Sequence, residues 1–380
     1  MDADAKNERL IASDGAPPHP ETGHKRKRVD DRLQVKRIHV IGDVFLDNVN
    51  ICDDFQFGKD NLGEIMHLPG GSALNTACHM ATHSKGMTDE VEVTLFSVIG
   101  KDAEGHMCLK RLEECGVKTE FVKQHPTRRT GICTVISTSG KDGRTAERGF
   151  ITSRGAVGHL TVDSFDWDAL VECDHLHIAG FYNLPAIFQV ESNFLQLKKL
   201  VETLSKKGVT STVNPQWDSS GRFSNILRLP VDAIVMNIDE ARMIMHNNGA
   251  PKLNLRGADD LYAPMEAIVL PHIPMAVVTL GADGMALIEK GSILRMGAPK
   301  LEAIDTTGGG DAASAGFVLG FSQRELRKCQ TSQEKYDAKL HWMKMGVLAG
   351  SEACRHIGGS VSDPVDFHKD GGESRAGNIS

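Results

Sequence analysis

The sequence predicts an α/β protein in which a mostly parallel β-sheet is covered by helices on both faces, with a small second β-sheet over a cleft. Short apolar runs that end at glycines alternate along the chain with segments of helical periodicity. Such alternation is typical of parallel sheets with helical crossovers. Two regions interrupt the alternation with strand-like and hairpin-like patterns, and these predict the second sheet.

The core elements follow one another in a regular order. We expect strands at 36–41, 91–99, 175–180, 210–213, 233–236 and 275–280. We expect helices at 103–115, 195–207, 238–246, 312–321 and 336–357, the first two ended by Gly116 and Gly208. In open parallel sheets ligands bind beyond the carboxyl ends of the strands. Functional residues are therefore expected in the segments that follow these strands.

The two interruptions lie at about 48–67 and 120–151. Within the second, 130–138 and 144–151 alternate as two antiparallel strands around the turn Gly140-Lys141-Asp142-Gly143. Insertions of β-structure that are split along an α/β core suggest a sheet that covers the active-site cleft. We refer to this sheet as the lid.

Both ends of the chain differ from the core in composition. Residues 1–35 carry many charges, three prolines and few large apolar side chains, too few to offset the entropy of ordering. We expect this basic, proline-containing segment and residues 370–380 to be disordered, which leaves 36–369 as the folded domain. The basic run at 24–28 is interpreted as a solvated charge run, with a nuclear address as the alternative.

The overall composition excludes several classes of protein. The 43 basic and 50 acidic residues give a formal net charge of −7, which argues against a broad nucleic-acid-binding surface. No apolar run reaches the roughly 18 residues that a membrane span needs, and the first residues lack the hydrophobic region of a signal peptide. The eight cysteines form no Cys-x-x-Cys pair. We expect a cytoplasmic protein whose partners are neither membranes nor nucleic acids.

A glycine-rich segment carries the strongest functional signal. The run Asp305-Thr306-Thr307-Gly308-Gly309-Gly310-Asp311 leads into an expected helix. Three glycines leave backbone N–H groups unshielded, and together with the helix dipole these donors form an anion site suited to a phosphate in transfer. A carboxylate beside a phosphate repels it, so Asp311 is best explained as a general base that takes a proton from an attacking hydroxyl. The alternative is a glycine-rich turn capped by an ordinary Asp.

Two further segments are suited to holding an acceptor. Gly70 and Gly71 precede Asn75 at the start of a helix of small residues. Paired glycines let a substrate approach the main chain, and the Asn75 amide can hydrogen-bond a hydroxyl; a hinge with a helix cap is the alternative. Asp43 and Asp47 follow the first strand, where a carboxylate can accept sugar hydroxyls or cap a loop.

Two segments are suited to a nucleotide. Asn237 and Glu240 lie three residues apart at a helix start, a spacing that suits a hydrated Mg²⁺ near phosphates and equally a capping box. Thr279, Gly281 and Gly284 surround a tight turn that can hold phosphates through its backbone or form a bare hairpin. The chain lacks the P-loop glycine–lysine motif, the His-Arg-Asp and Asp-Phe-Gly motifs of protein kinases, and a Rossmann glycine fingerprint.

Together these motifs resemble the ribokinase-like (PfkB) family of carbohydrate and nucleoside kinases, from about residue 36 to about residue 367. The segments 70–77 and 305–311 match the family's two signatures. Gly100-x-Asp102-x-x-Gly105, Asn237-x-x-Glu240 and Thr279-x-Gly281-x-x-Gly284 follow in the family's order and spacing. The resemblance implies a three-layer α/β/α core with a β-sheet lid, ATP as donor, Mg²⁺, and transfer to a primary hydroxyl. We also expect a homodimer formed through the lid.

The resemblance implies a role for each matching position. Asp311 would be the base, with the anion hole formed by Gly308, Gly309 and Gly310. Residues expected to hold the acceptor are Asp43, Asp47, Gly70, Gly71 and Asn75. Residues expected at the nucleotide are Asn237, Glu240, Thr279, Gly281 and Gly284, with Glu240 ordering Mg²⁺ through water. A monovalent cation such as K⁺ would bind Asp305 and Thr307, with Gly358 and Ser362 completing its ligands.

Two positions depart from the family pattern. Gly309 stands where the family usually has alanine, and Ala313 stands where phenylalanine is common, but neither change removes a reacting group. We predict an ATP-dependent sugar kinase that phosphorylates a primary hydroxyl, because 214–218 resembles a segment of sugar-kinase members. One alternative is a nucleoside kinase of the adenosine type with the same fold. The other is a non-catalytic scaffold with a kinase fold, which the intact Asp311 disfavours.

Overall fold

The large sheet is built around β1 (Lys36–Gly42), whose last five residues are buried. The computed structural model describes residues 35–138, 148–250, 258–323 and 328–367. The sheet has nine strands in the order β13-β12-β11-β10-β9-β8-β1-β4-β5. The predicted turn at 140–143 lies outside the described residues. The predicted tails at 1–35 and 370–380 also lie outside them, apart from Val35.

The strands of the large sheet are parallel except at one edge. The parallel strands after β1 are β4 (Val91–Gly100), β5 (Val122–His125), β8 (His175–Ala179), β9 (Thr210–Val213), β10 (Ala233–Asn237) and β11 (Met275–Thr279). The antiparallel edge is formed by β12 (Met285–Glu289) and β13 (Ser292–Met296). This antiparallel pair was not predicted, whereas every predicted core strand is present.

Helices cover both faces of the sheet. One face is covered by α1 (Ser72–Ser84), α2 (Ala103–Cys115), α8 (Gly309–Gln323) and α9 (Ser332–Ala353). The other face is covered by α3 (Trp167–Leu170), α4 (Pro185–Phe188), α5 (Glu191–Lys206), α6 (Ile238–Asn247) and α7 (Tyr262–Ile268). Side chains alternate along each strand. Val40 of β1 therefore packs on the face covered by α1 and α8, and Ile41 packs on the face covered by α5 and α6. The predicted three-layer α/β/α core is confirmed.

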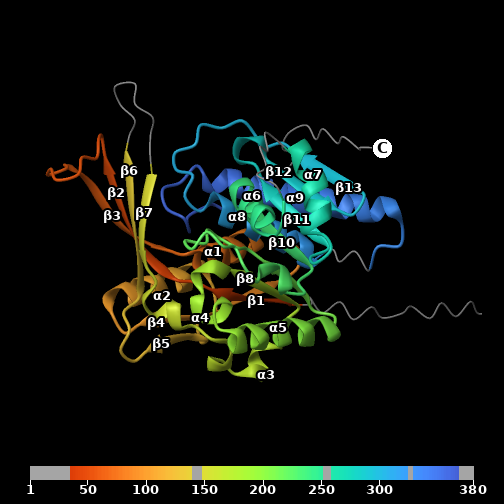
Figure 1. Ribbon diagram of the computed structural model, residues 1–380, viewed down its shortest axis with the longest axis horizontal. Coiled ribbons are helices and arrows are strands. Elements are labelled where there is room, and N and C mark those ends of the chain that lie inside the picture. Colours follow the sequence, from red (N-terminus) through yellow and green to blue (C-terminus); the bar gives the residue numbers. More distant parts are fainter. Residues whose placement is uncertain (1–34, 139–147, 251–257, 324–327, 368–380) are drawn as a thin grey trace, which may run out of the picture. The chain divides into compact units, whose positions relative to one another are not determined.

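The lid is a separate sheet of four strands, visible beside the large sheet in Figure 1. Its strands are β2 (Phe45–Cys52), β3 (Gly63–Gly70), β6 (Gly131–Thr138) and β7 (Arg148–Ser153). β2 pairs antiparallel with β3 and parallel with β6, and β6 pairs antiparallel with β7. The predicted small sheet is therefore present, assembled from the two interruptions.

One part of the lid prediction is wrong. We expected 120–151 to belong to the lid, but β5 extends the large sheet by pairing in parallel with β4. The reason is that Val122 is buried in the core between the sheet and α1 and α2, opposite Ser97 of β4. A four-residue strand shows too little alternation to reveal which sheet it joins.

The boundaries of three predicted helices also differ. α5 begins at Glu191 rather than at residue 195, because buried Phe194 adds a turn to its apolar face. α9 begins at Ser332, where Thr331 and Glu334 form a capping box, and ends at Ala353 rather than at residue 357. α8 begins at Gly309 rather than at residue 312. Asp311 consequently lies inside the first turn of α8. None of the helices in the described ranges is long and apolar enough to cross a membrane.

Candidate active site

The predicted functional segments converge at the carboxyl edge of the parallel strands. β1, β8, β9, β10 and β11 are neighbours in the sheet, so the segments that follow them emerge side by side. The amino-terminal ends of α1 and α8 lie at the same place, because side chains of α1 contact Asp311. The fold therefore brings together segments that are up to 239 residues apart in sequence.

Gly308 shapes the loop that precedes α8. Its φ of 73° is a left-handed conformation, and a Cβ there would lie 2.2 Å from the carbonyl oxygen of Gly359. A side chain at this position is therefore excluded by both strain and contact. By contrast, a Cβ on Gly310 would meet no atom within 4 Å. The N–H groups of the first helical turn have no acceptor within the helix, so open space and backbone donors coincide where the anion hole was predicted.

The Asp311 carboxylate is buried and accepts three side-chain hydrogen bonds. Oδ1 accepts from Ser72 Oγ at 2.8 Å and from Gln216 Nε2 at 3.1 Å, and Oδ2 accepts from Asn75 Nδ2 at 2.9 Å. Burial raises the pKa of Asp311 to about 6, against the opposing effect of these three donors. A carboxylate with this pKa is largely ionised at neutral pH and can still take up a proton, as a general base must.

The start of α1 supplies two of these donors. Gly71 precedes the helix with φ 95°, where a Cβ would lie 2.8 Å from the Asp43 carbonyl oxygen. The N–H of Ala73 donates to Asp43 Oδ1 at 3.0 Å, and Asn183 Nδ2 donates to Asp43 Oδ2 at 2.7 Å. Asp43 is fully buried, and burial raises its pKa to about 7. Asp43 thus binds the first turn of α1, and its contact with the acceptor stays a prediction.

Asn75, which we expect to hold the acceptor, contacts Asp311. Its Nδ2 donates to Asp311, while its Oδ1 is buried and has no hydrogen-bond partner among the described residues. A Cβ on Gly359 would lie 2.6 Å from Asn75 Nδ2. Asn75 is therefore packed between the base and the carboxyl-terminal segment, with a single oxygen left to accept a hydrogen bond.

Asp47 is an acidic side chain of the lid that lies near Asp43 and Asp311. It lies on β2, opposite Leu68 of β3 and Cys133 of β6. A Cβ on Gly70 would lie 2.1 Å from Asp47 Oδ2, so a glycine at 70 leaves room for this carboxylate. Burial, with smaller effects from the charges of Asp43 and Asp311, raises the pKa of Asp47 to about 7. No described residue donates a hydrogen bond to it.

The Asn237–Glu240 pair forms the capping box that we weighed against a metal-ordering role. Asn237 Oδ1 accepts from the N–H groups of Asp239 and Glu240, and Glu240 Oε2 accepts from the N–H of Asn237 at 2.9 Å. Burial raises the pKa of Glu240 to about 7, and the charge of Asp311 adds to this effect. Glu240 is thus close enough to the base to feel its charge.

The two glycines of the turn after β11 have different surroundings. Gly281 is exposed with φ 59°, and no atom lies within 4 Å of the place of its Cβ. Gly284 is buried with φ 91°, and its Cβ would lie 2.0 Å from the carbonyl oxygen of Met296. Gly281 and Thr279 are therefore available to a ligand, whereas Gly284 allows the turn to pack against β13.

The predicted monovalent-cation residues are only partly brought together. Asp305 Oδ1 accepts from the N–H and hydroxyl of Thr307, and Asp305 Oδ2 accepts from the N–H of Gly358 at 3.1 Å. Ser362 instead shares a 2.8 Å hydrogen bond with Nδ1 of His79. The other nitrogen of His79 lies 2.9 Å from the Gly359 carbonyl oxygen. His79 therefore fastens this carboxyl-terminal segment to α1.

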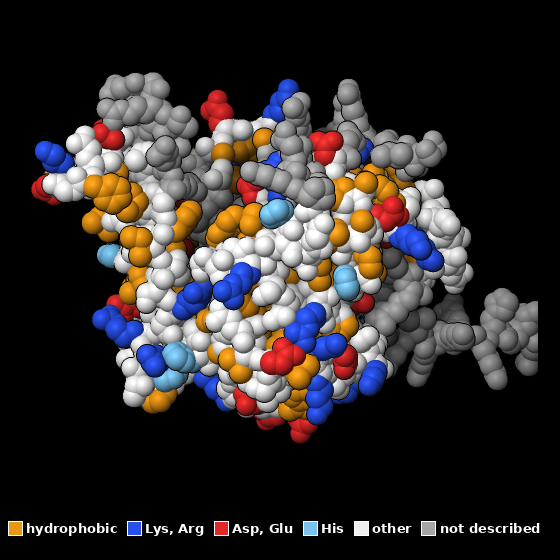
Figure 2. Space-filling view, viewed as in Figure 1, with side chains coloured by type: hydrophobic (Ala, Val, Ile, Leu, Met, Phe, Trp, Pro, Cys, Tyr) orange, Lys and Arg blue, Asp and Glu red, His pale blue; other side chains and the backbone are white. Residues whose placement is uncertain are grey.

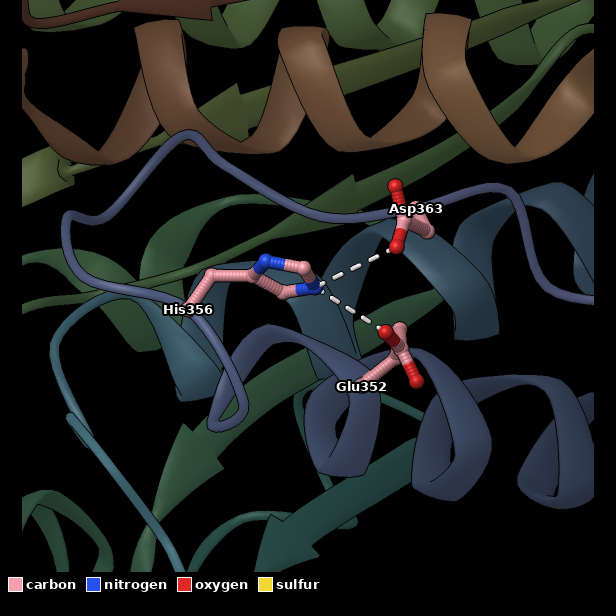
Figure 3. Close-up of side chains that lie close together, drawn as sticks. All are labelled: Glu352, His356 and Asp363. Atoms are coloured by element: carbon pink, nitrogen blue, oxygen red, sulfur yellow. Dashed lines mark hydrogen bonds and ion pairs between the residues drawn. The ribbon is translucent and has the colours of Figure 1, made fainter.

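A second group of polar residues borders the same segment. Figure 3 shows His356 Nε2 between Glu352 and Asp363, at 3.0 and 3.8 Å from their carboxylate oxygens. In the described part of the chain, this is the one group of three His, Cys, Asp or Glu side chains that could hold a metal. As an ion-pair cluster it ties the end of α9 to the loop that follows.

Sequence inspection missed several residues of the site. Ser72 lies inside a motif that we noted, yet its contact with Asp311 carried no local signal. Gln216 lies in the segment 214–218 that we noted without assigning it a role, and Asn183 and His79 were missed. Their partners lie 95, 140 and 280 or more residues away, so no spacing rule could have paired them.

A family model covers most of the described chain. The model of the pfkB family carbohydrate kinases matches residues 35–363. The chain is 23% identical over 274 residues to an adenosine kinase of Schizosaccharomyces pombe, an alignment that covers 68% of this chain and 75% of that protein.

Solved structures share the fold. A ribokinase from Giardia lamblia has a TM-score of 0.71 at 20% identity, covering 87% of this chain and 97% of the other. A ribokinase of Arabidopsis thaliana in complex with ribose and ATP has a TM-score of 0.67 at 17% identity, covering 87% and 96%. Because the family match spans most of the domain, the chain belongs to the pfkB family of carbohydrate kinases and is a phosphotransferase with an alcohol group as acceptor.

Proposed function

We propose that the chain transfers the γ-phosphate of ATP to a primary hydroxyl of a carbohydrate, with Asp311 as the general base. One observation carries this proposal. The buried carboxylate of Asp311 lies in the same helical turn as Gly310, whose outward side is open. A base is thereby placed next to backbone donors that can stabilise the charge of a transferring phosphoryl group.

The proposed step is an in-line displacement. The acceptor hydroxyl gives its proton to the Asp311 carboxylate while its oxygen forms a bond to the γ-phosphorus. The bond from the γ-phosphorus to the β,γ-bridging oxygen breaks, and ADP leaves with that oxygen. The N–H group of Gly310 would face an equatorial phosphoryl oxygen, whereas that of Gly309 donates to the Thr306 carbonyl oxygen at 3.3 Å. Such catalysis is mostly positioning and charge stabilisation.

The residues present fit ATP and its metal ion. Thr279 and Gly281 offer an accessible turn next to β10. Glu240 lies near Asp311, whose charge adds to the effect of burial in raising the pKa of Glu240. An Escherichia coli putative ribokinase II of the same fold was solved with ATP and Mg²⁺ (TM-score 0.62, 17% identity, 86% of this chain and 94% of that chain). We propose that Glu240 holds Mg²⁺ through water and that Asp305, Thr307 and Gly358 surround K⁺.

The acceptor is proposed to be a carbohydrate because of Asp47. Its carboxylate lies near Asp311 and lacks a hydrogen-bond donor among the described residues, so a polyhydroxy compound would satisfy it. One observation favours a nucleoside as a second candidate. On the face of the lid that carries Asp47, the strand register aligns Val49 with Met66 and Val135, and Val135 with Phe150. A nucleobase could pack on this apolar row.

A panel of acceptors tests the proposal. ATP consumption would be measured with pentoses, hexoses, keto-acid sugars and nucleosides, each with wild type and Asp311→Asn. We expect turnover with a carbohydrate that the variant lacks. Turnover with nucleosides alone would transfer the assignment to the second candidate. Silence with every acceptor would contradict a kinase and favour the scaffold alternative.

We also propose that two copies associate through the lid. Ile65 and Ile151 are more than 60% exposed, and the register places both on the lid face that carries Asn48 and Asn50. Figure 2 shows hydrophobic side chains gathered over the lid strands. Sedimentation equilibrium should give a dimer for wild type and a monomer for Ile151→Glu. A monomeric wild type would contradict this proposal.

A further inference from the structure

The two oxygens of the Asp311 carboxylate are used unequally. Oδ1 accepts two hydrogen bonds, from Ser72 and Gln216, whereas Oδ2 accepts one, from Asn75. Each oxygen of an ionised carboxylate offers about two lone-pair sites. Oδ1 is therefore saturated, and Oδ2 keeps one site for a further donor.

Gln216 reaches Asp311 from a backbone conformation that is unfavourable for its residue type. Its φ is 57°, in the left-handed region that few residues other than glycine adopt. Such strain persists only where the surrounding structure enforces it, and it is concentrated at functional sites. The strained backbone therefore distinguishes Gln216 from its neighbours.

The segment around Gln216 is held firmly on both sides. The carbonyl groups of Asn214 and Pro215 each accept a 3.0 Å hydrogen bond, from the N–H groups of Phe181 and Tyr182 respectively. On the other side, buried Asp218 accepts from the N–H of Phe223 at 2.8 Å. These contacts fix the backbone so that the Gln216 amide points at the base.

We propose that Gln216 is a positioning residue of the base. Its amide saturates Asp311 Oδ1, so that Oδ2 is the oxygen that takes the proton of the acceptor hydroxyl. This inference rests on the proposed function of Asp311. Two of the three hydrogen bonds to this carboxylate come from α1. The third comes from Gln216, which thereby fixes the plane of the carboxylate from the opposite side.

The proposal has a consequence for the pH dependence of catalysis. Each donor to the carboxylate favours its ionised form, so loss of the Gln216 amide should raise the pKa of Asp311. The neighbouring acids are Asp43 after β1, Asp47 on β2 and Glu240 on α6, each with a pKa raised partly by the charge of Asp311. Ser72 and Asn75 are the other groups that face it. Of these four acids, Asp311 is the one to which Gln216 donates a hydrogen bond. An altered pH profile therefore reports on that hydrogen bond.

Substitutions at position 216 can separate the amide from the backbone. Gln216→Gly removes the donor and relieves the left-handed strain, so the variant should be at least as stable as wild type. Gln216→Asn keeps an amide on a residue that tolerates the left-handed region, but its side chain is one carbon too short to reach Asp311. Ser219→Ala is the matched control, because Ser219 contacts Arg154.

The experiment measures kcat/KM for the acceptor against pH in the four proteins, with thermal unfolding in parallel. The acid limb of this profile reports the pKa of the free enzyme's base. We expect it near pH 6 in wild type and in the control. We expect it to be about one pH unit higher in both Gln216 variants, with kcat at high pH lowered by roughly tenfold or more and KM for ATP unchanged.

Several outcomes would overturn the proposal. An acid limb at the wild-type pH in both Gln216 variants would show that the amide does not act on the base. A loss of stability with an unchanged pH profile would assign Gln216 a structural role only. Asp311→Asn is measured beside them as the test of the underlying function. If that variant stays active, the base assignment itself has failed, which is distinct from failure at Gln216.

Discussion

Asn75 in the first turn of α1 donates a 2.9 Å hydrogen bond to Asp311 Oδ2 in the first turn of α8, across 236 residues of sequence. The two helices therefore meet at their amino-terminal ends, and the carboxylate lies at the positive end of both helix dipoles. A negative charge is favoured at such a place, although burial opposes it and raises the pKa of Asp311 to about 6. The balance leaves a carboxylate whose pKa lies close to neutral pH, which suits the proposed role of Asp311 as a base.

Replacing Asp311 with Asn should lower kcat by roughly 100-fold or more, because a general base typically contributes at least that factor. The shape of the side chain is kept, so ATP binding measured by calorimetry should be close to wild type. The rate is to be measured with the best acceptor of the panel. A variant that keeps more than about a tenth of the wild-type rate would exclude Asp311 as the base.

Gly310→Ala should reduce activity without weakening the fold. The added methyl group meets no protein atom within 4 Å, and alanine is favoured over glycine in a helix by roughly 0.5–1 kcal/mol. The same methyl group would occupy the space proposed for the phosphoryl group. Thermal unfolding and kcat/KM for ATP are the two measurements.

Gly308→Ala is the variant to be contrasted with Gly310→Ala in the same two measurements. It places a Cβ 2.2 Å from the Gly359 carbonyl oxygen at a φ of 73°, so both stability and activity should fall. Equal activity in Gly310→Ala and wild type would remove the phosphate from this position.

His83→Leu should stabilise the protein. His83 is fully buried, and neither ring nitrogen has a hydrogen-bond partner in the described structure. Such unpaired groups cost about 1–3 kcal/mol each. Burial lowers the pKa of His83 from 6.5 to about 3. Between these values the unfolded state binds more protons, so wild-type stability falls with falling pH by up to about 1.4 kcal/mol per pH unit from this group.

The leucine variant should lose that part of the acid sensitivity, measured by urea unfolding between pH 4 and 8. His79→Leu is the matched control one turn earlier, because both nitrogens of His79 are engaged, by Ser362 and Gly359. It should destabilise the protein and lower activity, since Gly359 contacts Asn75 and Gly308. Destabilisation by His83→Leu would contradict the proposed cost of its unpaired nitrogens.

Asp305→Asn should abolish stimulation by K⁺. The carboxylate of Asp305 accepts from Thr307 at one oxygen and from Gly358 at the other, and an amide would place a donor against one of these donors. Its neutral side chain would also attract a cation less. ATP consumption in potassium chloride is to be compared with that in tetramethylammonium chloride at equal ionic strength.

Ser362→Ala is the control for the cation site. The Ser362 hydroxyl is engaged by His79, so this variant should keep its response to K⁺. A wild type that is equally active in both salts would refute the proposed cation site, and a K⁺ response lost in Ser362→Ala would return Ser362 to the ligand set.

Local sequence patterns were sufficient for the order of the predicted core strands and helices, although not for the antiparallel edge formed by β12 and β13. α2 and β9 have the predicted bounds, and the run at 305–311 leads into α8 as expected. Periodicity, glycine and capping signals act over a few residues, so they are visible in one sequence.

Tertiary structure decided which contacts the polar side chains of those segments make. It buried Asp43 beneath α1, turned Asn75 toward the base and brought Gln216 to Asp311 Oδ1. These contacts join segments that are 30 to 236 residues apart. Burial, hydrogen-bond partners and the resulting pKa values depend on which distant segments pack together, and no local pattern encodes that arrangement.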